Sequence, residues 1–534
     1  MDERKPGAGR VVVPAGGAES ATRRPEPSSR WTNGPAIVAY LAAAMLLFRL
    51  ATAGVYGVFV DELYFFACGE HLAWGYVDMP PLTALQAWLA RSLFGDSMVA
   101  IRLLPALEGA GLVLLVGALT RRLGGGRFVQ GLAALAAALA PGAMAFYSIL
   151  SMNAVEPLVW TGMAYALVRV IQGEPRWWVV FGAVAGLGLE NKDTVLVFGF
   201  ALVLALLAVP ERRLMASRWF LLGGLVAFLI FLPSLVWMVQ HHFPHLEQLA
   251  NIRRNQRNVE LSPLAFVAQQ FLFMNPLAAP IWVGGLAWLL AGRPGRRYRV
   301  LGLAYLVSLA TLIATHGRFY YLGSVYPMLL AAGGVALERW LARPRLAWAR
   351  VAYTAVVVVS GAMLAPMFTP VLEPETFIRY SRAIGMGMPQ LEHRRTSALP
   401  QFFADRFGWP EMVETVAGVY HSLPPEERAK AAIFGQDYGQ AGAIDFYGPK
   451  LGLPKAISGH LTYWYWGPRG YTGQIVIVLG DTREALERLF ESVQEAAVVS
   501  HPYSMRSQNF TVFICREPRG WTFRDIWPRL KEWG

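Results

Sequence analysis

The stretch that decides the fold is AIVAYLAAAMLLFRLATAGV (residues 36–55), which is followed by VDELYFFACGEHLAWGYVDMPPL (residues 60–82). About twenty mostly apolar residues are enough to cross a bilayer as a helix, and the first segment meets this condition. The second segment places Asp61 and Glu62 just beyond the predicted span and adds Asp78 before two prolines. These acids are either solvated loop residues or groups that perform chemistry at the membrane surface.

The composition extends this prediction to most of the chain. Of its 534 residues, 55% are hydrophobic and only 16% are charged, and the mean hydropathy is +0.37. Soluble globular proteins carry about 25% charged residues. The pattern therefore predicts an all-α polytopic membrane domain with about 11 transmembrane helices. The candidate spans are 36–57, 99–120, 128–148, 155–171, 177–190, 194–210, 219–240, 264–290, 300–315, 320–340 and 349–369.

The distribution of basic residues predicts the orientation. With the N-terminus inside, the inner segments hold 22 Lys and Arg residues, whereas the outer segments between spans hold seven. Basic residues favour the cytoplasmic side of a membrane. We therefore expect a multi-pass protein of the cytoplasmic (inner) membrane with a cytoplasmic N-terminus. The net charge of +12 is explained by these segments, so no nucleic-acid partner is predicted.

The chain divides into three predicted regions. Residues 1–32 read as a disordered basic cytoplasmic tail, residues 33–370 form the transmembrane domain, and residues 371–534 form an extracytoplasmic α/β domain. The first outer loop, 58–98, contains a predicted interfacial helix at 80–95. In the C-terminal region, strands are predicted at 430–439, 473–480 and 509–517, and a helix is predicted at 481–493 with Asp481 as its N-cap.

The first-loop sequence DELYFFACGEHLAWGYVDMPPL resembles the motif of GT-C class glycosyltransferases related to protein O-mannosyltransferases and to the bacterial aminoarabinose transferases. The resemblance covers most of the chain, and the later segments gain weight from their order. These segments are SMNAVEPL (151–158), GLGLENKDTVL (186–196), WMVQHHFPHL (237–246), RFYYLGSVYP (318–327) and residues 435–468.

The resemblance implies an integral membrane glycosyltransferase that acts outside the cytoplasmic membrane. Such enzymes move a sugar from a polyprenyl-phosphate donor to an acceptor, which can be a lipid, a glycan or a protein. It implies Asp61 as the catalytic base, Glu62 as a neighbour that orients Asp61 or contacts substrate, and Asp78 as support from the same loop. Met79 stands where many relatives have a histidine, so any contact made by that histidine is absent here.

Six further residues are predicted to bind substrate, and simpler alternatives exist for them. Glu156 and Asn153 could face Asp61 across a cavity, although Glu156 could also be a helix N-terminal acid. Lys192 could bind the donor phosphate, or it could pair with a neighbouring acid. Arg318 is the same kind of candidate, because its planar guanidinium suits phosphate. The adjacent pair Tyr320 and Tyr321 could line a lipid groove or be interfacial aromatics.

The histidine-rich stretch at 241–245 completes the predicted set. His242 is assigned to substrate binding, whereas a metal site is disfavoured because Pro244 interrupts the helical spacing that ligands need. No cofactor and no metal are therefore predicted. Cys68 and Cys515 show no metal spacing, and they could pair only if both faced an oxidising compartment.

The alternative function is a lipid or solute transporter or flippase without transferase chemistry. Many spans and scattered charges would suit a transporter. However, the sequence shows no paired inverted halves and no helices broken by Gly or Pro at matching positions. The charged candidates also gather near one membrane face in the predicted topology.

Overall fold

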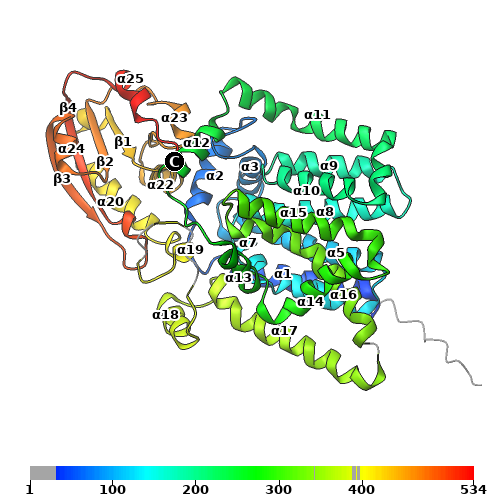
Figure 1. The fold of residues 1–534 in the computed structure, drawn as a ribbon. Coiled ribbons are helices and arrows are strands. Elements are labelled where there is room, and N and C mark those ends of the chain that lie inside the picture. Colours follow the sequence, from blue (N-terminus) through cyan, green and yellow to red (C-terminus); the bar gives the residue numbers. More distant parts are fainter. Residues whose placement is uncertain (1–31, 342, 388–391, 394–396) are drawn as a thin grey trace, which may run out of the picture.

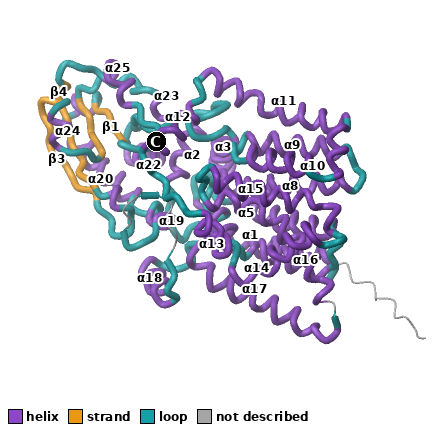
Figure 2. The backbone as a smooth tube through the Cα atoms, in the orientation of Figure 1, coloured by secondary structure: helices purple, strands orange, loops and turns teal. Residues whose placement is uncertain are grey.

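The computed structural model describes residues 32–341, 343–387, 392–393 and 397–534. The predicted basic tail, 1–32, thus lies almost wholly outside the described residues. Figure 1 shows a bundle of long helices beside a smaller C-terminal part that carries the sheet. Figure 2 shows that the strands are confined to this second part.

Seven helical segments in the described residues are long and apolar enough to cross a membrane. Two bent pairs raise this number to nine if each pair is one span. The seven segments are α1 (Gly34–Thr52), α5 (Leu103–Arg122), α8 (Met152–Ile171), α11 (Arg218–Gln240), η3 with α15 (Gly295–Ala314), η4 with the first part of α16 (Phe319–Glu338) and α17 (Ala347–Phe368). The bent pairs are α10 (Val195–Leu207) with η1 (Pro210–Ala216), and α13 (Pro263–Phe273) with η2 and α14 (Pro276–Ala291).

All eleven predicted apolar segments are helical, but the predicted count of about eleven spans is not confirmed. The two remaining segments are α6 (Arg127–Ala138) and α9 (Trp177–Leu189), with 12 and 13 residues. At about 1.5 Å per residue, each is only about 20 Å long, whereas the hydrocarbon core is about 30 Å thick. The apolar runs therefore predicted helices correctly, whereas the helix lengths depend on where each chain segment turns.

The segment predicted as the first outer loop is itself helical. It contains α2 (Val60–Glu70), α3 (Leu82–Phe94) and α4 (Met98–Ile101). Helix α3 confirms the helix predicted at 80–95. Three further helices of the bundle, α7 (Pro141–Phe146), α12 (Pro244–Arg254) and α18 (Pro374–Ala383), lie between or beside the long segments.

The C-terminal part contains a four-stranded sheet with the order β1-β2-β4-β3. Strand β1 pairs parallel to β2, and the other neighbours are antiparallel. The strands are β1 (Ala431–Gly435), β2 (Ile475–Leu479), β3 (Phe490–Val499) and β4 (Phe510–Pro518). Three of them confirm the predicted strands.

The helix predicted at 481–493 is mostly wrong. Helix α24 spans only Arg483–Glu487, and its N-cap is Thr482, whose hydroxyl accepts a hydrogen bond from the Ala485 amide. The chain then enters β3, because its backbone from Phe490 onward pairs with β4. Hydrogen bonding to β4 at the edge of the sheet thus favours a strand here, although the local sequence has helical periodicity.

Both faces of this sheet are covered. On β2, Ile475, Ile477 and Leu479 pack with α20 (Trp409–Ser422) and α22 (Tyr438–Tyr447). The alternate residues of β2 pack on the other side with α24 and α25 (Phe523–Ile526). The short helices α19 (Gln401–Ala404), α21 (Pro425–Arg428) and α23 (Tyr463–Trp466) complete this part.

Helix α2 packs directly on α22, so the first outer loop shares one hydrophobic core with the C-terminal part. The close approach requires glycine at position 442, because a Cβ there would lie 3.0 Å from the Leu63 side chain and backbone. At position 439 a Cβ would lie 2.6 Å from Val60. The two helices therefore run side by side with their first turns together. Cys68 on α2 and Cys515 on β4 are both buried and free, so they do not form the disulfide considered above.

Candidate active site

Asp61 lies in the first turn of α2 and lines a cavity of about 630 Å³. Its Oδ1 accepts a hydrogen bond of 2.6 Å from the Tyr438 hydroxyl, at the start of α22. Burial raises the pKa of Asp61, and the Tyr438 hydrogen bond partly offsets this rise because it stabilises the carboxylate. A carboxylate with a raised pKa is a stronger base than a solvated one, so Asp61 is suited to accept a proton.

Glu62 points away from this cavity. Its side chain is 0% exposed and forms an ion pair with Arg102, with 2.8 Å between Oε2 and Nη2. It also accepts hydrogen bonds from the backbone amides of Phe59 and Leu150. Burial alone would raise the pKa of Glu62, but Arg102 and the two amides hold it below its usual value. These partners occupy both carboxylate oxygens, so the structure places Glu62 in the support of α2 and not at the cavity.

Asp78 lines the same cavity from the end of the first motif. Its Oδ1 accepts a hydrogen bond of 2.7 Å from the Tyr64 hydroxyl, which also lies 2.5 Å from the hydroxyl of Thr462 in the C-terminal part. Burial raises the pKa of Asp78 to about 6. The charge of Asp61 contributes to this rise, whereas that of His245 opposes it. Asp61 and Asp78 therefore line the same cavity.

Lys192 brings a positive charge to the cavity from the turn between α9 and α10. Its Nζ lies 2.7 Å from Asn153 Oδ1 and 3.0 Å from Glu156 Oε2. It also lies 4.0 Å from the centre of the Tyr321 ring. Glu156 is buried behind Lys192 and holds it in place, whereas Asn153 and Lys192 line the cavity.

Arg318 brings the second positive charge, immediately before η4 (Phe319–Val325). Its guanidinium donates hydrogen bonds to Tyr320 at 3.1 Å, Asn258 at 2.7 Å and Glu392 at 2.8 Å. Arg257 lies on the other side of Glu392, with 3.3 Å between Nε and Oε2. Two arginines of the cavity lining, Arg257 and Arg318, therefore pair with the same carboxylate, that of Glu392.

The histidine predicted to bind substrate is not at the cavity. His242 is exposed and has a positive φ of 59°, in the turn that ends α11. His245, three residues later on α12, lines the cavity instead and lies 3.4 Å from Asp193. The positive φ values at 242 and 243 break the helical spacing, so a count along a helix cannot tell which histidine faces inward.

Apolar side chains form a further part of the cavity lining. It extends from Tyr320 and Tyr321 to side chains of several helices. These apolar lining residues include Phe146, Ile149, Phe273, Met367, Phe368 and Phe377. The cavity thus contains charged residues beside α2 and apolar residues from the apolar helices. This combination suits a ligand with a charged group and a lipid tail.

The sequence reasoning did not identify Tyr438, Glu392 or His245 as site residues. Tyr438 stands in GQDYG, a segment that belonged to the resemblance but carried no role. Its contact with Asp61 spans 377 positions, so spacing could not predict it. In the described residues, no group of three or more His, Cys, Asp and Glu side chains is arranged to hold a metal ion.

The site can now be compared with known proteins. Residues 78–237 match a family model described as dolichyl-phosphate-mannose-protein mannosyltransferase. Two crystal structures of ArnT from Cupriavidus metallidurans share the fold at 16% sequence identity, over 89% of this chain and 97% of that chain. The TM-score is 0.58 for the apo state and 0.57 for the state bound to undecaprenyl phosphate.

A second similar structure is the oligosaccharyltransferase of Archaeoglobus fulgidus, in a complex with zinc and sulfate. It has a TM-score of 0.51 at 12% identity, over 77% of this chain and 61% of that chain. No curated protein sequence matches the chain significantly. The shared architecture of helical bundle and C-terminal domain confirms the predicted type of fold.

Proposed function

We propose that the chain is a membrane glycosyltransferase of the GT-C class, which transfers a sugar from a polyprenyl-phosphate donor to an acceptor outside the cytoplasmic membrane. The observation that carries the proposal is the composition of one cavity. Asp61, Lys192 and Arg318 line it together, and apolar side chains form a further part of its lining. A base, cations for a phosphate and room for a lipid are the elements that this reaction needs.

In this proposal the donor binds with its lipid tail in the apolar part of the cavity. Its phosphate lies between Lys192 and Arg318, whose charges stabilise the phosphate as it gains negative charge on leaving. Glu392 pairs with both Arg318 and Arg257. The ArnT structure holds undecaprenyl phosphate, which supports the same class of donor here.

The transfer itself is a single displacement. Asp61 takes the proton from an acceptor hydroxyl or amine, and the acceptor atom forms its bond to the anomeric carbon. The bond from that carbon to the phosphate oxygen breaks on the opposite face, and its electron pair stays with the polyprenyl phosphate. The product therefore has the inverted configuration. Tyr438 and Asp78 hold the base region in place through hydrogen bonds.

A transporter is the less favoured function. The cavity is lined by Asp61 of α2 and Tyr438 of α22, and Figure 1 shows both helices where the C-terminal part meets one end of the helical bundle. A transporter of the inverted-repeat type places its site near the middle of the membrane. The family match also favours transfer over transport.

The first experiment compares wild type with Asp61→Asn in nanodiscs, using radiolabelled polyprenyl-phosphate sugars and a membrane extract as the source of acceptors. We expect wild type to transfer label and the variant to lose activity about 10²- to 10⁴-fold, because the amide cannot accept the proton. Asp96→Asn is the matched control, since Asp96 is an exposed acid of the same loop that pairs with Arg91. Full activity in Asp61→Asn would contradict its assignment as the base.

A further inference from the structure

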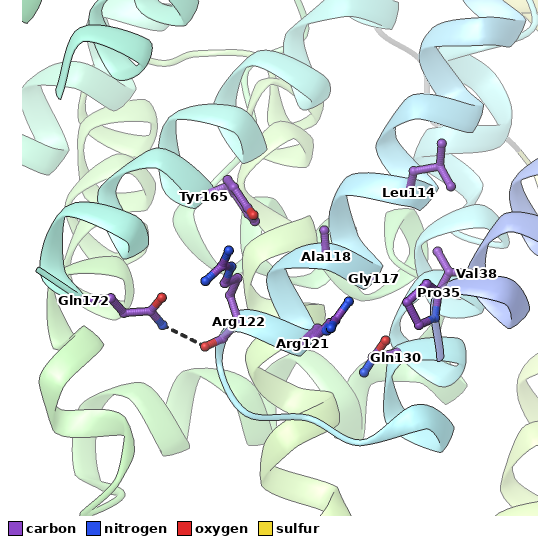
Figure 3. A pocket seen from close by; sticks show the side chains of 10 residues that line it. All are labelled: Pro35, Val38, Leu114, Gly117, Ala118, Arg121, Arg122, Gln130, Tyr165 and Gln172. Carbon is purple, nitrogen blue, oxygen red and sulfur yellow. Dashed lines mark hydrogen bonds between the residues drawn. The ribbon is translucent and has the colours of Figure 1, made fainter. Parts of the chain in front are cut away.

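A second cavity, of about 510 Å³, lies at the other end of the bundle. It is formed by the start of α1, the ends of α5 and α8, and the start of α6 (Figure 3). The end of α1 near Ala53 contacts Arg102, which supports the active site. Because α1 has 19 residues, its start is about 28 Å from that end, so the two cavities are separate.

The second cavity is basic. Arg121 and Arg122 close α5, and their side chains lie beside Tyr165 and Gln130 in Figure 3. Neither arginine has a carboxylate within 4.0 Å among the residues that the structure describes. By contrast, the nearby Arg169 is neutralised by Glu174. Two guanidinium groups at one cavity, neither in an ion pair with a carboxylate of the described residues, therefore favour an anionic ligand.

The same cavity also has an apolar wall that runs along the membrane-type helices. Leu114 is 46% exposed and lies seven residues before Arg121 on α5, which places it about 10 Å deeper along the helix. Val38 of α1 lies across Gly117, where a Cβ would meet it at 2.6 Å. Gly117 therefore allows α1 and α5 to pack closely. Val38 and Leu114 then form an apolar surface next to Arg121 and Arg122.

We propose that this cavity binds one anionic phospholipid. Its phosphate is held by Arg121 and Arg122, polar headgroup atoms face Gln130 and Tyr165, and an acyl chain lies against Leu114. Basic pockets between membrane helices are suited to such headgroups. The apolar wall favours a lipid over a soluble phosphate, because a soluble anion would leave that wall uncovered. This site is independent of the proposed transferase activity.

The test measures lipid binding to the purified full-length protein by native mass spectrometry. Phosphatidylglycerol and phosphatidylcholine serve as probes, and Arg121→Gln/Arg122→Gln is the test variant. We expect wild type to prefer phosphatidylglycerol, and the variant to bind it about tenfold or more weakly. Arg212→Gln/Arg213→Gln is the matched control, since these exposed arginines lie on η1, which packs on α8.

Several results would overturn the proposal. The test variant could bind phosphatidylglycerol as wild type does, the control pair could lose binding equally, or phosphatidylcholine could bind as tightly. Displacement by millimolar glycerol phosphate would identify a soluble phosphate site instead. If the double variant does not fold, Leu114→Trp replaces it, because filling this part of the cavity should weaken phosphatidylglycerol binding without a change of charge. Unchanged phosphatidylglycerol binding in Leu114→Trp would show that no acyl chain lies against Leu114, which contradicts the proposal.

Discussion

At the scale of single residues, the protonation of Asp61 depends on contributions of opposite sign. Burial favours the neutral acid, whereas the hydroxyl of Tyr438 favours the carboxylate. The charges of Arg257 and Arg318 also favour the carboxylate, and that of Glu392 opposes it. A base must be ionised before it can accept a proton, so Tyr438 tunes the pH at which Asp61 can work.

Replacement of Tyr438 by Phe tests this tuning. The variant keeps the ring and loses the hydrogen bond, so the pKa of Asp61 should rise further. We expect the acid limb of the pH–rate profile to move upward by about one to two pH units, because a hydrogen bond to a charged group contributes about 1.5–3 kcal/mol. Transfer rates measured across pH check this. Tyr420→Phe is the control, since that hydroxyl bonds only to the Arg428 carbonyl within the C-terminal part; equal profiles for both variants would contradict the role.

Lys192 should determine how tightly the lipid phosphate binds. We expect Lys192→Gln to weaken binding of sugar-free polyprenyl phosphate about tenfold or more, because a charge-assisted hydrogen bond is lost. Binding is measured by titration in detergent. Thermal unfolding of the variant checks that the protein remains stable, because Glu156 loses its ion pair with Lys192. Lys455→Gln is the matched control, because Lys455 pairs with Glu70 at the surface. Unchanged affinity in a folded Lys192→Gln protein would place the phosphate elsewhere.

At the scale of elements, α2 is held by the acid that sequence reasoning assigned to catalysis. Glu62 bonds to the Phe59 amide before its own helix and to Arg102 before α5. Arg102 also donates to the Ala53 and Gly57 carbonyls beyond the end of α1. One buried ion pair thus joins α1, α2 and α5, and it fixes the turn that presents Asp61.

The variant Glu62→Gln separates the two possible roles of Glu62, which are to stabilise α2 through Arg102 and to contact substrate. We expect a loss of about 3–5 kcal/mol in the free energy of unfolding, because Arg102 is 2% exposed and would remain as a buried, unpaired charge. Glu70→Gln, at the exposed end of the same helix, should cost less than about 1 kcal/mol. Denaturant unfolding of both variants checks this.

The activity of folded Glu62→Gln protein decides the sequence-based prediction. If Glu62 only supports α2, the rate per folded molecule should stay within a few fold of wild type. A stable variant that has lost transfer would show that Glu62 contacts substrate, as the resemblance implied.

Elements and site residues were predictable to different degrees. The apolar runs predicted the helices, since about twenty apolar residues have few other stable structures in a membrane. The strand β3 was missed because the helical pattern of residues 481–493 includes its first residues, Phe490 to Val493, which pair with β4 instead. Asp61, Asp78, Lys192 and Arg318, which line the cavity, were predicted from one motif and from charges where few are expected. Tyr438 and Glu392 reach the cavity only through tertiary packing, which one sequence does not reveal.

At the scale of the whole molecule, the cavity is built by the bundle and the C-terminal part together. Asp61 and Lys192 come from the bundle, whereas Tyr438 and Leu461 come from the C-terminal part. The contact between the two depends on the packing of α2 on α22. If this contact is needed for activity, a change far from the cavity should abolish transfer when it separates the two helices.

Gly442→Val makes this change. A Cβ at Gly442 would already lie 3.0 Å from the backbone and side chain of Leu63, so the larger side chain must move α22 away from α2. We expect transfer to fall at least tenfold, because Tyr438 loses its hydrogen bond to Asp61. The amides of α2 should also exchange hydrogen faster. Gly418→Val is the matched control, since a Cβ at this position of α20 meets nothing within 4 Å. If Gly442→Val keeps both its activity and its exchange protection, the C-terminal part is not required to hold the base.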